Sequence, residues 1–226
     1  MHLYTSLQCA VAVMFLSGCC LLMATDTSPD KTGEATVSPQ EAKLLRHVRT
    51  LAAENPRAAI AKLRDALRED SSAAFYLVLA GYCAQVDDLE SAVAYAKKAR
   101  RKKDDYSRAK ELLAKVLLRQ GKPEEAVGHF IALARRRGQK AGAMWRFAGE
   151  AMLAADKPVE AEVAFKQALL HHPSDHQVRL PLIQALLAQD RAAAAKPLIE
   201  RQLTETPIDK RLWRLLVAYE LERGNK

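Results

Sequence analysis

Aromatic residues are scarce in this chain, at 6% of its 226 residues, and Ala and Leu dominate its 49% hydrophobic content. No segment alternates apolar and polar residues in the way that a half-buried β-strand does. The nine glycines and nine prolines fall mostly between runs with helical periodicity. The lack of strand patterns excludes sheet-based folds, and the lack of large side chains favours close packing of helices. The sequence therefore predicts an all-α protein.

Catalytic patterns are also missing. Serine is sparse, and no serine or cysteine lies in the strand-turn-helix elbow that exposes a nucleophile. Gly138 and Gly142 are not followed by the Gly-Lys-Ser/Thr of a phosphate-binding loop. Glu124 and Glu125 open a predicted helix, where negative charge complements the helix dipole. These absences predict a protein that is not an enzyme and carries no cofactor.

Cysteine is too rare to form a disulfide framework. The chain has four, at Cys9, Cys19, Cys20 and Cys83. The first three lie in the apolar N-terminal segment. Cys83 falls at an apolar position of a predicted helix, where a buried thiol is expected.

Histidines cluster in the segment His171-His172-Pro173-Ser174-Asp175-His176. Clustered imidazoles can bind zinc or copper. These three, however, span a predicted helix end, a proline and the next helix start. Histidine near a helix C-terminus interacts favourably with the dipole, and Ser174 is a natural N-cap. The structural explanation is favoured, and no metal site is predicted.

Positive charge exceeds negative charge, with a net charge of +8. Residues 1–18 carry no Asp, Glu, Lys or Arg, and residues 19–39 carry three acidic residues and one lysine, so residues 40–226 carry +10. A basic body suggests acidic proteins, anionic envelope polymers, phospholipid head groups or nucleic acid as partners. The basic runs 100–103 and 135–137 end predicted helices, where cations are favoured. No aromatics are interleaved with them in the sequence, so nucleic-acid binding is not predicted.

One motif organises the chain. Small and large residues alternate across two predicted helices, with a proline that ends the second: Trp145, Ala148, Gly149, Met152, Ala161, Phe165 and Pro173. Gly149 and Ala161 are the small positions at which the paired helices approach closely, and Phe165 fills the space beside them. This spacing resembles the tetratricopeptide repeat, with Ala and Met in place of its usual Leu and Tyr.

The motif recurs along the chain. The small residue of the second helix returns at intervals of 33, 34, 35 and 34 residues, at Ala59, Ala92, Ala126, Ala161 and Ala195. Turns inside the helix pairs are marked by Asn55-Pro56 and by Asp or Gly at 87–88, 121–123, 156–158 and 190–191. The resemblance implies a superhelical solenoid over 40–226, with no internal domain boundary.

The two ends of the solenoid differ from its middle. The first repeat is degenerate: it keeps an apolar stripe that includes Val48, but Arg46 occupies the usual Leu position. After Pro207 a single helix is expected over 210–224, with Trp213, Leu216 and Val217 in the first-helix pattern. We therefore expect about five helix-turn-helix repeats and a C-terminal capping helix.

The N-terminal segment Leu16-Ser17-Gly18-Cys19 resembles the lipobox of bacterial lipoproteins. The resemblance implies that residues 1–18 are a signal peptide, that Cys19 is lipidated, and that residues 19–39 form a flexible tether. A secretory signal cut near Ala24, an uncleaved anchor and a wrongly chosen start codon remain as alternatives.

Together, the two resemblances imply a small repeat lipoprotein of the bacterial envelope. Such a protein is expected to face the periplasm, more often on the outer than the inner membrane. It would act as a non-catalytic scaffold that assists a pilus, secretion or export machine. The alternative is a basic module that binds anionic polysaccharide or cell-wall polymer.

The concave wall of such a solenoid is lined by the first helices of the repeats. The register of Trp145 places eight charged residues there: Arg108, Glu111, Lys115, Arg119, Arg146, Glu150, Arg211 and Arg214. Five leucines lie among them: Leu77, Leu118, Leu153, Leu180 and Leu187. A mixed basic and apolar wall predicts an acidic amphipathic segment of a protein partner, with its carboxylates near Arg119 and Arg146.

Overall fold

The computed structural model describes residues 37–103, 107–136, 138, 140–205, 210, 212–214 and 216–217. The predicted signal peptide, Cys19, nearly all of the tether and Arg211 lie outside the described residues. Within those residues, no helix has both the length and the apolar character needed to cross a membrane.

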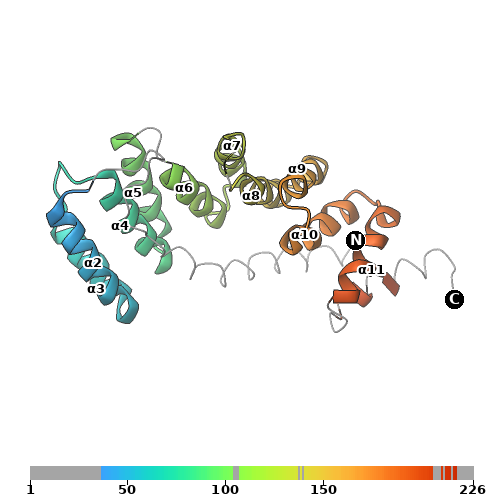
Figure 1. Ribbon diagram of the computed structural model, residues 1–226, viewed down its shortest axis with the longest axis horizontal. Coiled ribbons are helices and arrows are strands. Elements are labelled where there is room, and N and C mark those ends of the chain that lie inside the picture. The colour runs from blue at the N-terminus through green and yellow to red at the C-terminus, as the bar shows by residue number, and fades with distance from the viewer. Residues whose placement is uncertain are drawn as a thin grey trace. The chain divides into compact units, whose positions relative to one another are not determined.

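Every regular element of the described chain is a helix, as the sequence predicts (Figure 1). The helices are α2 (Pro39–Glu54), α3 (Pro56–Asp65), α4 (Ala73–Gln85), α5 (Leu89–Lys102), α6 (Ser107–Arg119), α7 (Pro123–Ala134), α8 (Ala141–Ala154), α9 (Pro158–His171), α10 (His176–Leu187) and α11 (Ala192–Glu205). Helices adjacent in sequence pack together, including α2 with α3, α4 with α5, α8 with α9 and α10 with α11. This is the helix-pair arrangement expected of the repeat.

The turn inside a helix pair repeats its backbone conformation. Asp87, Gly121, Asp156 and Asp190 have φ values of 65°, 72°, 56° and 56°. They are 34, 35 and 34 residues apart, which is the period of the repeat. Gly adopts this left-handed conformation readily, and Asp is one of the few other residues that tolerate it. The turn residues seen in the sequence thus set the reversal of the chain.

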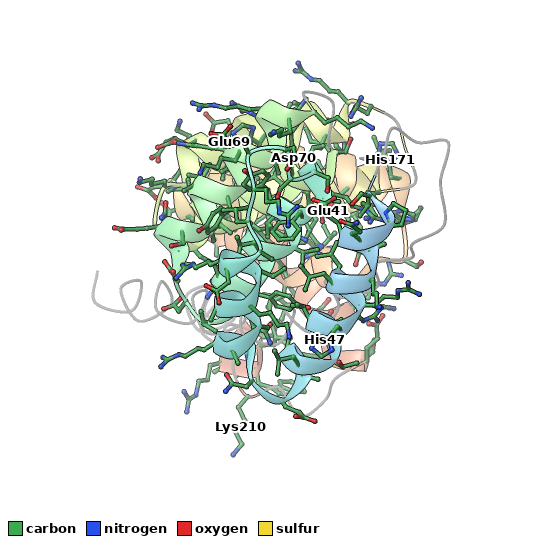
Figure 2. The ribbon with its side chains drawn as sticks, turned by 90° about the vertical axis from the view of Figure 1, so that its left-hand side faces the viewer. Glu41, His47, Glu69, Asp70, His171 and Lys210 are labelled. Atoms are coloured by element: carbon green, nitrogen blue, oxygen red, sulfur yellow. The ribbon has the colours of Figure 1, made fainter. Side chains whose placement is uncertain are left out.

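Side-chain caps fix several helix starts. Ser38 and Glu41 form a capping box on α2, while Asn55, Ser72 and Asp88 cap α3, α4 and α5. Glu41 also accepts a hydrogen bond from the Ser72 backbone N–H at 2.9 Å, which ties α2 to the start of α4. Figure 2 labels Glu41 at the end of α2 that lies by the loop containing Glu69 and Asp70.

The small positions of the motif are buried as a set. The alanines Ala59, Ala92, Ala126, Ala161 and Ala195 are each 0% exposed. At Gly149, an added Cβ would lie 2.5 Å from Cε1 of Phe165, whose side chain is also 0% exposed. Trp145 is partly buried against the core cluster that contains Ala161 and Phe165. The second helix of the motif, α9, ends at His171, two residues before Pro173.

The described chain divides into two compact units, one up to Ala126 and the other from Val127 onward. The core of the second unit joins Ala161, Phe165, Ile183, Ile199 and their neighbours. The first unit buries Val48 of the degenerate first repeat, together with Leu63 and Leu79. The expectation of one continuous body over 40–226, without a boundary, stays a prediction.

Two local predictions are wrong. The N-cap of α10 is Asp175, which accepts from the Gln177 N–H at 2.9 Å, and not Ser174. In the C-terminal helical segment, Leu212 is 1% exposed, whereas Trp213 and Val217 are 47% and 52% exposed. Positions 212 and 216 share one helix face, and positions 213 and 217 lie about 100° away around the helix. Leu216 thus packs on the core as predicted, but Leu212 takes the place of Trp213 and Val217 on the packing face.

Candidate functional site

In the first unit, α6 carries four of the predicted groove residues. Lys115 Nζ lies 2.7 Å from Glu111 Oε1, one helical turn away, and both side chains are about three-quarters or more buried. Arg119 donates to the Ala84 carbonyl at 2.7 Å and to Asp87 Oδ1 at 2.8 Å. Arg119 therefore holds the turn between α4 and α5. Arg108, at the start of α6, is half-buried.

In the second unit, α8 carries Arg146 and Glu150, whose side chains are each 15% exposed. Arg146 Nη1 lies 2.7 Å from Glu150 Oε1, and Arg146 Nε lies 4.0 Å from Asp175 Oδ2. The guanidinium sits 4.4 Å from the centre of the Phe147 ring, which stacks on Phe130. This side chain is embedded in the fold and is not a solvated cation.

The predicted wall therefore differs from its sequence description. We expected basic side chains awaiting an acidic partner, but Lys115, Arg119 and Arg146 already contact carboxylates of this chain. Arg211 lies outside the described residues, and Arg214 is exposed. The reason is helical spacing, because Glu111 and Glu150 each lie four residues from a cation. Lys115, Arg119 and Arg146 are thus each paired with a carboxylate of their own unit.

The leucines of the wall keep part of their surface accessible. Leu77 packs against a small cluster at the ends of α4, α5 and α6 in the first unit, and Leu118 is also half-buried. In the second unit, Leu153, Leu180 and Leu187 are partly buried against the main core cluster. Each unit thus presents half-buried leucines on first helices beside ion pairs.

The histidine cluster has structural contacts. His172 covers Gly142, where a Cβ would clash with the imidazole ring. His176 Nδ1 lies 3.1 Å from Glu205 Oε2, which also accepts from Arg179 at 2.6 Å. Among the described residues, no group of three or more His, Cys, Asp or Glu side chains could hold a metal ion.

Sequence reasoning missed a buried carboxylate. Glu162 has a side chain only 7% exposed and accepts from Lys166 at 2.8 Å, Gln189 at 3.1 Å and Arg191 at 2.5 Å. The hydrogen bond from Lys166 leads the effects that lower the pKa of the Glu162 carboxyl, with Gln189 and Arg191 adding to it. The neighbouring motif positions Ala161 and Phe165 were the sequence signals that this side of α9 meets another helix.

Cys83 is fully buried beside Arg64, whose guanidinium lies 3.1 Å from Asp88 and 3.2 Å from Ser91. Burial raises the pKa of the Cys83 thiol. A buried thiol with a raised pKa is a poor nucleophile, which agrees with the packing role expected for this residue.

Comparisons with known proteins point to one family. Two family models, both described as tetratricopeptide repeat, match residues 152–219 and residues 50–107 and 111–175. Neither model describes an enzyme. No curated protein matches the sequence.

Solved structures agree on the fold. A tetratricopeptide repeat protein from Parabacteroides merdae is 15% identical with a TM-score of 0.69, over 81% of this chain and 73% of that one. MamA from Desulfovibrio magneticus, residues 41 to the end, is 18% identical with a TM-score of 0.68, over 77% of this chain and 100% of that one. A chain of the Cut9–Hcn1 hetero-tetramer of APC/C is 19% identical with a TM-score of 0.59, over 77% of this chain and 35% of that one. At these identities the likeness shows the fold alone. With family models that span most of the described helices, this chain belongs to the tetratricopeptide-repeat family.

Proposed function

We propose that this protein is a non-catalytic interaction scaffold of the bacterial cell envelope, which assists assembly or stability of a pilus, secretion or export machine. The half-buried leucines on the first helices carry the proposal. They offer apolar contacts that the fold leaves incompletely buried, beside charges that can orient a ligand. Repeats of this family are interaction modules, which supports a scaffold role.

The proposed ligand is an acidic amphipathic segment of a partner protein. Its apolar side chains would cover first-helix leucines within a unit, such as Leu118 in the first unit or Leu187 in the second. Its carboxylates would replace those carboxylates of this chain that pair only weakly with basic side chains of the wall. Asp87, for example, is 77% exposed, so its pair with Arg119 is strongly screened by solvent. An incoming carboxylate that is buried on binding can displace Asp87 at little cost.

Site-specific photo-crosslinking in intact cells tests this function. A photoreactive residue at Leu118 or at Leu187 should capture the same partner, identified by mass spectrometry. A residue at Val163, which is 57% exposed on α9, is the matched control and should not capture it. Capture that is equal from all three positions would contradict a first-helix binding surface.

The role of the basic side chains in binding is tested with the purified partner segment. Arg119→Glu combined with Arg146→Glu should abolish binding, whereas Arg136→Glu combined with Arg137→Glu should not. Because Arg146 is embedded, the single variant Arg119→Gln serves where the double variant melts early. Equal loss from both double variants would indicate diffuse charge attraction.

We further propose that Cys19 is lipidated and anchors the protein to the membrane, facing the periplasm, in the outer rather than the inner membrane. Support comes from Leu16-Ser17-Gly18-Cys19 and the polar stretch Thr25–Ser38. Mass spectrometry of the membrane fraction should find acyl groups on Cys19, and Cys19→Ala should release the protein or block its processing. An unmodified Cys19 in that fraction would remove the lipoprotein assignment.

A further inference from the structure

Helix α9 (Figure 1) carries an apolar stripe that the second unit leaves exposed. Val159, Val163 and Leu170 are 58%, 57% and 75% exposed. They are three of the five large hydrophobic side chains that are exposed among the described residues. Their spacings of four and seven residues place all three within about 40° of one another around the helix. α9 therefore buries one apolar face in its own core and presents a second one to solvent.

The repeat itself does not require this stripe. Counted from the small alanine of each second helix, the same three positions are charged, polar or small in the other repeats. They are Arg57, Ala61 and Arg68 in the first, Glu90, Ala94 and Arg101 in the second, Glu124, Gly128 and Arg135 in the third, and Ala193, Pro197 and Thr204 in the fifth. The stripe belongs to the fourth repeat alone, so the packing that all repeats share does not explain it.

The stripe has the spacing of a seam between two paired helices. Val159, Val163, Lys166 and Leu170 follow one another at intervals of four, three and four residues, which is the spacing of the core positions of a coiled coil. The charged member, Lys166, has its Nζ 2.8 Å from Glu162 Oε1, and its side chain is 62% exposed. Because its ammonium is already paired, its aliphatic stem can cover an apolar neighbour.

We infer that α9 pairs with α9 of a second copy of this chain, in antiparallel orientation about a two-fold axis. Val159 of one copy then lies opposite Leu170 of the other, and Val163 lies opposite the stem of Lys166. Each layer joins a short side chain to a longer one. The two-fold axis generates each layer twice, because the same patch serves both copies. The stripe is therefore complementary to itself.

Polar side chains beside the stripe favour the antiparallel orientation. Glu160 flanks it near the start of α9, and Gln167 and His171 flank the same side nearer the end; Figure 2 labels His171. In the antiparallel pair, Glu160 of one copy faces Gln167 and His171 of the other, where its carboxylate can accept hydrogen bonds. A parallel pair would instead set the two acidic ends, and the like ends of the two helix dipoles, side by side.

The size of the seam predicts that the pair is weak. From Val159 to Leu170 the helix rises only about 16 Å. One helix from each copy buries less than the roughly 800 Å² per partner of a standard stable interface. The pair should therefore form at high concentration and dissociate on dilution.

A lipid surface fits this face less well than a second copy. Helices that lie in a membrane interface combine basic flanks with aromatic side chains on the apolar face. α9 instead exposes two valines and a leucine beside Glu160. The inference goes beyond the proposed function and does not depend on it, because the scaffold surface lies on first helices and the stripe on a second helix.

Sedimentation velocity of the full-length protein, from about 1 μM to about 1 mM, tests the pairing. The wild type should pass from monomer to dimer over this range. Val163→Glu should weaken the dimer about tenfold or more, since it places a carboxylate from each copy in the middle of an apolar seam. Circular dichroism should show that the variant folds, because Val163 is exposed in the single chain.

Val217→Glu is the matched control. Val217 is a valine of similar exposure, 52%, that lies outside α9. Its substitution should change the dimer less than about twofold. Both variants keep the apolar N-terminal segment, so association through that segment would affect them equally.

Disulfide formation between engineered cysteines tests the orientation. The three N-terminal cysteines are first replaced by Ser, which leaves only the buried Cys83. A mixture of the Val159→Cys and Leu170→Cys variants should then form a disulfide about tenfold or more faster than either variant alone, because the bond requires close Cα atoms. In the antiparallel pair, like positions lie about 16 Å apart along the helix axis.

Four results would overturn the inference. A wild type that stays monomeric over the whole range would show that the copies do not pair. Equal weakening by Val163→Glu and Val217→Glu would place the contact outside α9. Faster disulfide formation by each cysteine variant alone would indicate parallel helices. Capture of lipid or of another protein by a photoreactive residue at Val163, without a second copy, would give the stripe a different occupant. Crosslinking at Leu118 and Leu187 decides the scaffold role separately.

Discussion

At Gly149 the packing of α8 on α9 leaves no space for a side chain, since an added Cβ would lie 2.5 Å from Phe165. Gly149→Ala should therefore lower the free energy of unfolding by about 1–3 kcal/mol, the usual cost of overpacking. The better helix propensity of Ala, about 1 kcal/mol, offsets part of that. Chemical denaturation measures the difference.

Gly128 provides the matched control for this substitution. It is exposed on α7, and an added Cβ would meet nothing within 4 Å. Gly128→Ala should leave stability unchanged or raise it by up to about 1 kcal/mol. If Gly149→Ala were as harmless as Gly128→Ala, the close approach of Phe165 would be wrong.

Glu162 is the residue at which stability should depend on acid. The lowered pKa of its carboxyl means that the folded state favours the ionised form. Its contribution to stability is present above the ordinary carboxyl pKa of 4.5 and is lost as pH falls through the lower folded pKa. The melting temperature of the wild type should fall more steeply below pH 4.5 than that of Glu162→Gln. Parallel curves would show that Glu162 contributes no pH-dependent stability.

At the scale of the element, the start of α10 shows which of two adjacent residues, Ser174 or Asp175, caps the helix. Asp175 caps the Gln177 N–H and lies near Arg146, whereas the sequence pattern favoured Ser174. Asp175→Ala should cost about 1 kcal/mol, the usual loss for an N-cap, and Ser174→Ala should be nearly neutral. Thermal melts of the two variants provide the comparison. The reverse order of stabilities would restore Ser174 as the cap.

The position of a helix boundary explains why the sequence favoured the wrong cap. Ser and Asp are almost equally good N-caps, so composition cannot choose between neighbours. The choice depends on where the turn after α9 ends, and in that turn His172 packs over Gly142. A similar one-residue change exposes Trp213 and buries Leu212.

At the scale of the whole molecule, the division into two compact units predicts how far the destabilising effect of a core substitution extends along the chain. Leu79 is 0% exposed in the first unit, and Leu79→Ala should cost about 2–5 kcal/mol. In repeat proteins each repeat contacts mainly the repeats next to it. Hydrogen exchange of the full chain should therefore rise in α4, α5 and their neighbours, with little change in α9 to α11. A uniform rise would support the single continuous body that the repeat pattern predicts.

The sequence by itself determined the family, the helix pairs and the small positions where helices approach closely. Side-chain volume is a local property that recurs with the repeat, so Ala59 and its four counterparts could be found by spacing alone. The turn residues were equally visible, because few residues accept a positive φ.

Only the tertiary structure decided which charged side chains meet. Arg119 and Asp87 are 32 residues apart, and Arg191 and Glu162 are 29 apart. Long flexible side chains reach partners on other helices, and the relative positions of backbones select among them. The pairs Glu111–Lys115 and Arg146–Glu150 follow from helical spacing, but the sequence did not show that Arg119 meets Asp87. It also showed basic residues near the end of α5, but not that the fold places Tyr76 and Tyr95 beside Lys98.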